Sequence, residues 1–256
     1  MRYDAVIFDL FGTLIDSLSR REYERVLAEM AGVLGIPCGD FVRLWLATSY
    51  ERAVGILASS EANIAHCYRA LGREGGPAGV ADAVEIRTRF TQRALVPRPG
   101  STETLLALRA AGYRLGLISD CSSEVSLLWS GTPFAPLFDE ALFSCAVGLK
   151  KPDPRIYQLA CDRLGVPPER CLYVGDGGSR ELSGAAAVGM RPVLLRAAHE
   201  DASDAHRIDA EDWDGPTIAA LPDVLALVED GAAGTPIARG AGNAVSPAIQ
   251  AAQGAP

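Results

Sequence analysis

Acidic side chains stand at the ends of two apolar runs that are typical of buried strands. Asp9 follows the apolar residues 6–8, and Asp176 follows a run that ends at Gly175, with Glu181 five residues further on. Carboxylate oxygens are the ligands that Mg²⁺ prefers in proteins. A carboxylate that faces a metal-bound phosphoryl group is also a nucleophile, because an aspartyl-phosphate divides the transfer into two easier steps. These residues therefore predict metal-assisted chemistry, provided that the fold brings them together.

Polar groups that suit an anion follow two further predicted strands. Ser119 and Asp120 end the run LGLISD, and Lys151 follows the predicted strand at 141–146. A hydroxyl and an ammonium group both donate hydrogen bonds to phosphate oxygens. A single Asp after a strand is most often a turn former or a helix cap. The order Asp, Ser, Lys and Gly-Asp at successive strand ends is therefore the informative signal, rather than any one residue.

Short apolar strands alternate with helices over most of the chain. The predicted strands cover residues 3–9, 113–119, 141–146, 170–176 and 191–196, and the predicted helices cover 101–112, 122–129, 153–165, 180–188 and 222–229. This alternation predicts an α/β fold with a parallel sheet that helices cover on both faces. Ligands of such sheets bind outside the carboxyl ends of the strands. The polar residues named above stand at those ends, so we expect them to converge.

Residues between about 18 and 93 show helical periods and no convincing strand. The expected helices cover 21–35, 40–57, 60–72 and 78–95, which predicts a four-helix insert. Arg43 and Arg52, on the second of them, are candidate substrate-binding residues, although a solvated or core position is the more common one for such side chains. Residues 231–256 are rich in Gly, Ala and Pro and predict a disordered tail without chemistry.

Composition excludes several classes of protein. The net charge of −8 and the pI of about 5.0 argue against a nucleic-acid or anionic-membrane surface. No segment approaches the roughly 20 apolar residues of a membrane span, and the first residues lack the pattern of a signal peptide. We therefore expect a cytoplasmic protein. Six cysteines without a CxxC pair, together with three histidines, argue against a zinc site.

In the order and type of these motifs, the chain resembles the haloacid dehalogenase (HAD) superfamily of hydrolases. DLFGT at 9–13 resembles the first motif of that family, Ser119 the second and Lys151 the third. GDGGSRE at 175–181 resembles the fourth, with Glu181 where Asp is more usual. The resemblance covers roughly residues 3–196. It implies a Rossmann-like core made of residues 1–16 and 97–230, with an α-helical cap of the C1 type inserted at residues 17–96.

The resemblance also implies a reaction and a set of roles. The reaction is the hydrolysis of a small phosphorylated metabolite with Mg²⁺ as cofactor. In it, Asp9 would be the nucleophile, Thr13 would orient its loop, Ser119, Asp120 and Lys151 would bind the substrate, and Asp9, Asp176, Glu181 and the backbone carbonyl of Phe11 would bind the metal. The identity of the substrate and the oligomeric state stay open.

Phe11 departs from the pattern of the family's phosphatases, which usually carry a second Asp there. That Asp protonates the leaving group and then activates water, and Phe cannot transfer a proton. A bulky aromatic residue at this place is closer to the 2-haloacid dehalogenases, which work without Mg²⁺, yet this chain keeps Gly175-Asp176. Two alternatives to the phosphatase therefore stay open. One is a dehalogenase-like hydrolase, and the other is a non-catalytic binding or regulatory protein on this scaffold.

Overall fold

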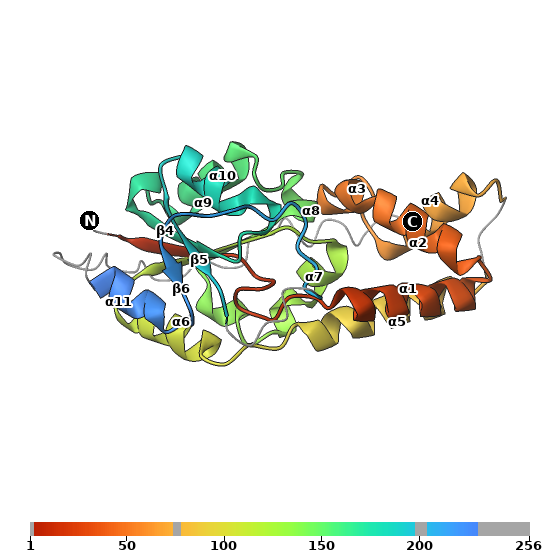
Figure 1. Cartoon of the computed structure of the whole chain (residues 1–256), viewed down its shortest axis with the longest axis horizontal. Coiled ribbons are helices and arrows are strands. Elements are labelled where there is room, and N and C mark those ends of the chain that lie inside the picture. The colour runs from red at the N-terminus through yellow and green to blue at the C-terminus, as the bar shows by residue number, and fades with distance from the viewer. Residues whose placement is uncertain (1–2, 74–77, 198–203, 230–256) are drawn as a thin grey trace.

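A parallel sheet forms the centre of the protein. The structure, a computed structural model, describes residues 3–73, 78–197 and 204–229. These residues form a six-stranded sheet in the order β3-β2-β1-β4-β5-β6, and every neighbouring pair is parallel (Figure 1). The strands are β1 (Ala5–Phe8), β2 (Arg114–Ser119), β3 (Glu140–Phe143), β4 (Cys171–Gly175), β5 (Arg191–Leu195) and β6 (Thr217–Ile218).

Helices cover both faces of this sheet, because alternate residues of each strand point to opposite sides. In β1, Val6 and Phe8 belong to one buried apolar cluster, which also contains residues of α6 (Ser101–Ala110) and α11 (Asp223–Glu229). Ala5 and Ile7 belong to the other, with residues of α9 (Pro154–Leu164) and α10 (Glu181–Ala187). Short elements complete the core: α7 (Ser123–Leu128), α8 (Ser144–Val147), η1 (Trp129–Gly131), η2 (Ala135–Leu137), η3 (Pro168–Arg170) and η4 (Gly178–Arg180).

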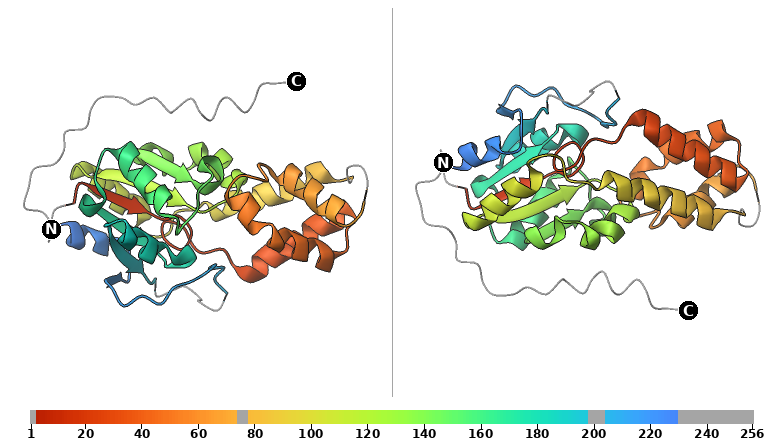
Figure 2. Two further views of the ribbon diagram at one scale, coloured as in Figure 1. Left: turned by 90° about the horizontal axis from the view of Figure 1, so that it is seen from above. Right: turned by 90° about the horizontal axis from the view of Figure 1, so that it is seen from below.

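A helical insert follows β1 and extends beyond the carboxyl edge of the sheet (Figures 1 and 2). Its helices are α1 (Arg20–Leu34), α2 (Cys38–Ala47), α3 (Ser49–Ala53), α4 (Ser60–Ala70) and α5 (Val80–Ala94). They share an apolar core of their own, in which Trp45 and Phe41 are fully buried. The chain enters and leaves the insert at one place, where Ile15 pairs with Pro97 and the backbone N–H of Arg98 donates to Leu14.

The predicted fold class is confirmed, and some of the predicted elements change. The strand expected at 141–146 ends at Phe143, and α8 follows at once. The helix expected at 40–57 breaks after Ala47, where the Thr48 hydroxyl lies 3.1 Å from the carbonyl oxygen of Leu44 and 3.0 Å from that of Trp45. Strand β6 was not predicted, since it is two residues long.

Two further expectations about organisation remain predictions. The first is the pair of domain boundaries at 16/17 and 96/97, which limited proteolysis at these two positions would check. The second is the disordered tail at 231–256, which lies outside the described residues.

Among the residues that the structure describes, no single helix is long and apolar enough to cross a membrane. Helices α1 and α2 pass that test only as a pair, and the pair is bent by 119°.

Two helical glycines test how tightly α10 packs against α9. A Cβ at Gly184 would lie 2.6 Å from the hydroxyl oxygen of Tyr157, which is fully buried, whereas a Cβ at Gly32 would meet nothing within 4 Å. Both alanine substitutions remove the same backbone freedom, so their difference isolates the steric clash. We expect Gly184→Ala to lower the free energy of unfolding by roughly 1–3 kcal/mol and Gly32→Ala to raise it by roughly 0.5–1 kcal/mol. Urea unfolding of both variants measures this, and a stabilised Gly184→Ala would contradict the packing.

Candidate active site

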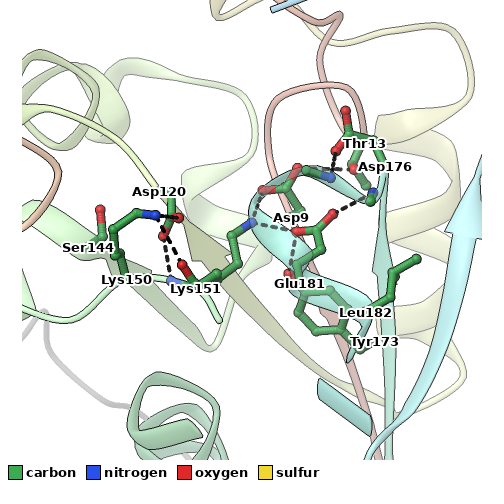
Figure 3. A network of polar contacts seen from close by, with 12 residues as sticks. Asp9, Thr13, Asp120, Ser144, Lys150, Lys151, Tyr173, Asp176, Glu181 and Leu182 are labelled. Carbon is green, nitrogen blue, oxygen red and sulfur yellow. Dashed lines mark hydrogen bonds and ion pairs between the residues drawn. The ribbon is translucent and has the colours of Figure 1, made fainter. Parts of the chain in front are cut away.

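The central strands of the sheet bring the sequence-predicted acids to one edge. In the order β2-β1-β4, Asp120 follows the first strand, Asp9 the second and Asp176 the third. The connection after β1 places α6 on one face of the sheet and the connection after β4 places α10 on the other, and this change of side opens a crevice at the strand ends. Figure 3 shows the resulting network of polar side chains, to which Lys151 and Glu181 also belong.

Three buried carboxylates form the centre of this network. One ligand atom from each of Asp9, Asp176 and Glu181 lies within 4.8 Å of the other two. Lys151 lies among them, since its Nζ is 2.6 Å from Asp9 Oδ1 and 2.5 Å from Glu181 Oε2. The hydroxyl of Thr13 donates to Asp9 Oδ2 at 3.2 Å. Direct contacts therefore join the ends of β1 and β4 to the loop after α8, which carries Lys151.

Glu181 reaches the cluster because the backbone turns sharply after Asp176. Ser179 and Arg180 both adopt positive φ, at 53° and 51°, which costs non-glycine residues about 1–3 kcal/mol each and is found mostly at functional sites. The carboxylate of Glu181 then accepts from the hydroxyl of Tyr173 at 2.8 Å and from the backbone N–H of Gly177 at 2.9 Å. Three donors, Lys151 included, thus hold a side chain that is fully buried.

Burial and mutual repulsion weaken the acidity of these carboxyl groups. Burial raises the pKa of Asp9 to about 6 and that of Glu181 to about 8, while Lys151 opposes both shifts and Asp176 adds to them. Burial alone would lower the pKa of Lys151, but the attraction of Asp9 and Glu181 outweighs it and raises that pKa. Lys151 therefore stays an ammonium ion. When all three carboxylates are ionised, they exceed the charges of Lys151 and Arg207 by one negative charge.

A cavity of about 510 Å³ opens beside this cluster and reaches the helical insert. From the core it is lined by Asp9, Phe11, Asp120, Lys150, Lys151 and Asp176 among others, and from the insert by Tyr23, Leu46, Ser49, Tyr50, Arg52, Ala53 and Arg87. A space of this size suits a small metabolite. Its walls combine the edge of the sheet with one side of the insert, so a ligand in it would contact both.

The other predicted site residues divide into two groups. Asp120 lines the cavity and accepts from the backbone N–H of Lys151 at 3.0 Å, while Lys150 Nζ lies 3.6 Å from its second oxygen. Ser119 is fully buried and does not line the cavity. Arg52 lines it, but Arg43 does not: its side chain is 66% exposed and pairs with Asp40 at 3.3 Å. The structure thus does not bring Arg43 to the site.

Sequence reasoning missed the segment that follows β5. Arg207 places its Nε 2.6 Å from Asp176 Oδ2, and the ring of His206 stacks on Tyr23 with centroids 5.2 Å apart. Backbone bonds hold the segment in place, because the N–H of His206 donates to Leu18 and that of Arg20 to Asp204. No motif or spacing marks these residues, since their role arises from pairing with a segment about 185 residues earlier in the chain. Arg87, on α5, was missed for the same reason.

Two buried tyrosines donate hydrogen bonds to different parts of Glu181, one to its carboxylate and one to its backbone. Tyr173 donates to the carboxylate, whereas Tyr157 donates to the backbone carbonyl of the same residue at 3.0 Å. A hydrogen bond to a charged group contributes roughly 1.5–3 kcal/mol and a neutral one roughly 0.5–1.5 kcal/mol. Since the pKa of Glu181 is about 8, we expect the cost of Tyr173→Phe to grow from pH 7 to pH 9, as the carboxyl group ionises, and that of Tyr157→Phe to stay constant.

Urea unfolding with a chelator present, at both pH values, measures the two costs. If Tyr173→Phe costs the same at pH 7 and pH 9, the hydrogen bond does not distinguish the two charge states of Glu181.

Known proteins resemble this chain over most of its length. A glyceraldehyde 3-phosphate phosphatase of Pyrococcus furiosus is 30% identical over 239 residues, which are 89% of this chain and 94% of the relative. One of Methanothermobacter thermautotrophicus is 33% identical over 138 residues, which are 53% of this chain and 58% of the relative. The crystal structure of a 2-haloacid dehalogenase from Pseudomonas syringae shares the fold, with a TM-score of 0.63 at 23% identity, over 91% of this chain and all of that one.

A protein-family model also matches most of this chain. Residues 3–189, which include every residue of the carboxylate cluster and Lys151, match the model of the haloacid dehalogenase-like hydrolases. The match starts in the segment before β1 and continues through the helical insert to the end of α10, so it includes the strand ends that carry the acidic residues. The chain is therefore a hydrolase of the haloacid dehalogenase-like family.

Proposed function

We propose that this hydrolase is a Mg²⁺-dependent phosphatase of a small phosphorylated metabolite and that Asp9 is its nucleophile. The observation that carries the proposal is the position of Asp9, whose carboxylate contacts Lys151 in a buried acidic cluster and lines a cavity at the carboxyl edge of the sheet. The relatives that are named as phosphatases of glyceraldehyde 3-phosphate support a phosphoryl substrate.

The residues present fit a divalent cation. Three carboxylates supply oxygen ligands within 4.8 Å of one another, and their negative charge exceeds that of the cations beside them. Gly12 has a φ of 80°, and a Cβ there would clash with Asp176 Oδ2. Only glycine therefore leaves the space beside the carboxylate of Asp176 open. Asp9, Asp176, Glu181 and the backbone carbonyl of Phe11 would hold the ion. When bound, Mg²⁺ neutralises charge between the acid and a phosphoryl group.

The chain's own residues would divide the reaction into two steps. A carboxylate oxygen of Asp9 attacks phosphorus, the bond from phosphorus to the ester oxygen breaks, and that oxygen leaves as an alkoxide or phenoxide that takes a proton from water. Water then cleaves the acyl-phosphate and releases inorganic phosphate. Lys151 keeps Asp9 in place and attracts the phosphoryl oxygens, and Thr13 orients the turn. The role of Ser119 as a further donor stays a prediction, because its side chain does not line the cavity. The insert above the cavity would exclude bulk water during these steps.

Phe11 lines the cavity and offers no proton to the leaving group. This observation favours a second candidate, a hydrolase that forms the same ester at Asp9 and expels a halide, which needs no proton. Release of halide from 2-haloacids without metal would identify that activity. A protein that binds metal but converts neither phosphate esters nor haloacids would instead be a binding or regulatory protein.

The proposal makes leaving-group basicity the main determinant of the rate. General acid assistance is worth about 10²–10⁴-fold in rate, and Phe11 cannot supply it. We therefore expect measurable hydrolysis of acyl and aryl phosphates, a steep fall in kcat/KM as the pKa of the phenol rises, and slow or no turnover of alkyl phosphates. Asp9→Asn should abolish turnover and leave the fold intact, since the amide is nearly isosteric.

Steady-state kinetics on a graded series of aryl phosphates measures this slope. A flat dependence, with chemistry shown to limit the rate, would mean that another group supplies the proton. Substantial activity in Asp9→Asn would mean that another residue is the nucleophile.

Binding of Mg²⁺ should stabilise the protein more at pH 8.5 than at pH 6. The folded-state pKa of Glu181, about 8, lies above the usual value of 4.5, and that of Asp9 is raised to about 6. Raised acid pKa values favour the protonated folded state, so the metal-free protein loses this contribution to stability as the pH rises through 6 and 8. The ion binds the deprotonated groups, and a concentration of 100 times its Kd adds about 2.7 kcal/mol.

Thermal melts with and without Mg²⁺ at the two pH values measure this difference. Asp176→Asn should lose the Mg²⁺-induced rise in Tm, and Asp40→Asn, which removes an exposed acid on α2, should keep it. An equal rise in Tm at both pH values would argue against these carboxylates as the ligands.

A further inference from the structure

The helical insert contributes two buried arginines to the cavity. Arg52, on α3, and Arg87, on α5, are each 6% exposed, and both line the same cavity as Asp9. Buried arginines are rare, because a guanidinium ion loses its hydration unless other groups replace the water. The surroundings of each side chain therefore show whether the protein itself supplies those groups.

Arg52 is held by the insert. Its Nη1 donates to the backbone carbonyl of Trp45 at 2.5 Å and to the hydroxyl of Thr48 at 2.8 Å. Its guanidinium also lies over the indole ring of Trp45, 4.6 Å from the centroid. These contacts fix the position of the side chain, and Arg52 therefore presents a stationary positive charge at the wall of the cavity.

Arg87 is less well satisfied. Among the described residues, its Nε and Nη1 have no hydrogen-bond partner, although both atoms are buried. Its Nη2 lies 3.5 Å from the hydroxyl of Ser122, and Glu124 Oε1 is 3.7 Å from Nε, too far for a hydrogen bond. Unpaired donors on a buried charged group are costly. An acceptor that enters the cavity would remove that cost.

The charges at this end of the cavity do not balance. Burial would raise the pKa of Glu124, but Arg87 and the hydroxyls of Ser122 and Ser60 outweigh it and lower that pKa, so Glu124 is ionised. The pKa of His206 is lowered, mainly by burial and further by Arg20 and Arg87, so this ring adds no positive charge at neutral pH. Arg52 and Arg87 thus face one carboxylate, Glu124, and a positive charge is left over.

We propose that Arg87, together with Arg52, binds a second anionic group of the substrate. The proposal rests on the proposed function, in which the phosphoryl group of the substrate lies at Asp9. It assigns the substrate to the small phosphate monoesters that carry a carboxylate or a second phosphate elsewhere in the molecule. Arg87 would bind that group through Nε and Nη1, and Arg52 would add its charge. Carboxylate and phosphate present the same oxygen acceptors to a guanidinium fork, so both belong to this class.

Binding of three non-hydrolysable probes tests the proposal independently of catalysis. The probes are phenylphosphonate, 3-carboxyphenylphosphonate and 1,3-phenylenebisphosphonate, titrated calorimetrically with Mg²⁺ present. A charged hydrogen bond of roughly 1.5–3 kcal/mol corresponds to about 10–100-fold in Kd. We expect at least one of the two doubly anionic probes to bind the wild type about 10-fold or more tightly than phenylphosphonate does, and the better of them identifies the second group.

Substitutions on α5 and α7 then assign the effect to Arg87. Arg87→Met should remove the tighter binding of the doubly anionic probe and leave the Kd of phenylphosphonate within about 2-fold of the wild-type value. Arg89→Met is the matched control, because Arg89 is exposed on the same helix and pairs with Glu85. Glu124→Gln removes the carboxylate that competes for Arg87, so the doubly anionic probe should bind this variant several-fold more tightly. If Arg87→Met does not fold, Arg87→Lys takes its place, with a smaller loss expected because lysine lacks the fork.

Three results would overturn the proposal. The first is equal binding of all three probes by the wild type, and the second is an equal loss for every probe in the Arg87 variant. The third is weaker binding of the doubly anionic probe by Glu124→Gln, which would make the Arg87–Glu124 pair a structural contact between insert and core. Absence of phosphatase activity with the expected binding pattern would refute the proposed function and leave the anion subsite in place.

Discussion

The rest of the site depends on the ion pairs that the ammonium group of Lys151 forms. It lies between Asp9 and Glu181, two carboxylates that would otherwise repel each other in a buried environment. Attraction to both acids outweighs the cost of burying the lysine, and the raised pKa of Lys151 expresses that balance. Because this ammonium ion contacts side chains that follow two different strands, it also fixes the distance between Asp9 and the acidic turn after β4.

The geometry around this ion requires unusual backbone. Glu181 folds back toward Lys151 only because Ser179 and Arg180 adopt positive φ. Its carboxylate then gains the hydroxyl of Tyr173 and the N–H of Gly177. Gly12, on the facing turn, avoids a clash with Asp176. The conformational cost is concentrated in two short turns, while the strands that carry them stay regular, which is a common division at sites that must be preorganised.

The cavity has ends of opposite charge. At the edge of the sheet, three carboxylates outnumber the cations Lys151 and Arg207, and the surplus suits a divalent ion. At the insert, Arg52 and Arg87 outnumber Glu124, and the surplus suits an anion. A ligand that carries negative charge at both of its ends would satisfy the metal-loaded edge and the insert together. Selectivity would then come from the second group, because any phosphate ester offers the first.

Predictions at the strand ends came directly from the sequence, whereas those in the insert needed the structure. Asp9, Asp120 and Asp176 could be placed from the apolar runs before them, because parallel strands end at one edge whatever the length of the connections. Arg43 and Arg52 were placed on one helix, although nine residues at about 100° each already set them on opposite faces, and the break at Thr48 then turned Arg52 inward.

Position along the chain likewise says nothing of contacts between distant segments. Arg207 meets Asp176, and Arg87 meets Glu124, only because the fold packs the segment after β5 on the start of α1 and α5 on α7. Local pattern therefore determined the sheet, its acidic edge and the Phe11 that departs from the family's phosphatases. Packing between elements decided the charges of the cavity, because a side chain's electrostatic surroundings are made of residues from every element that contacts it.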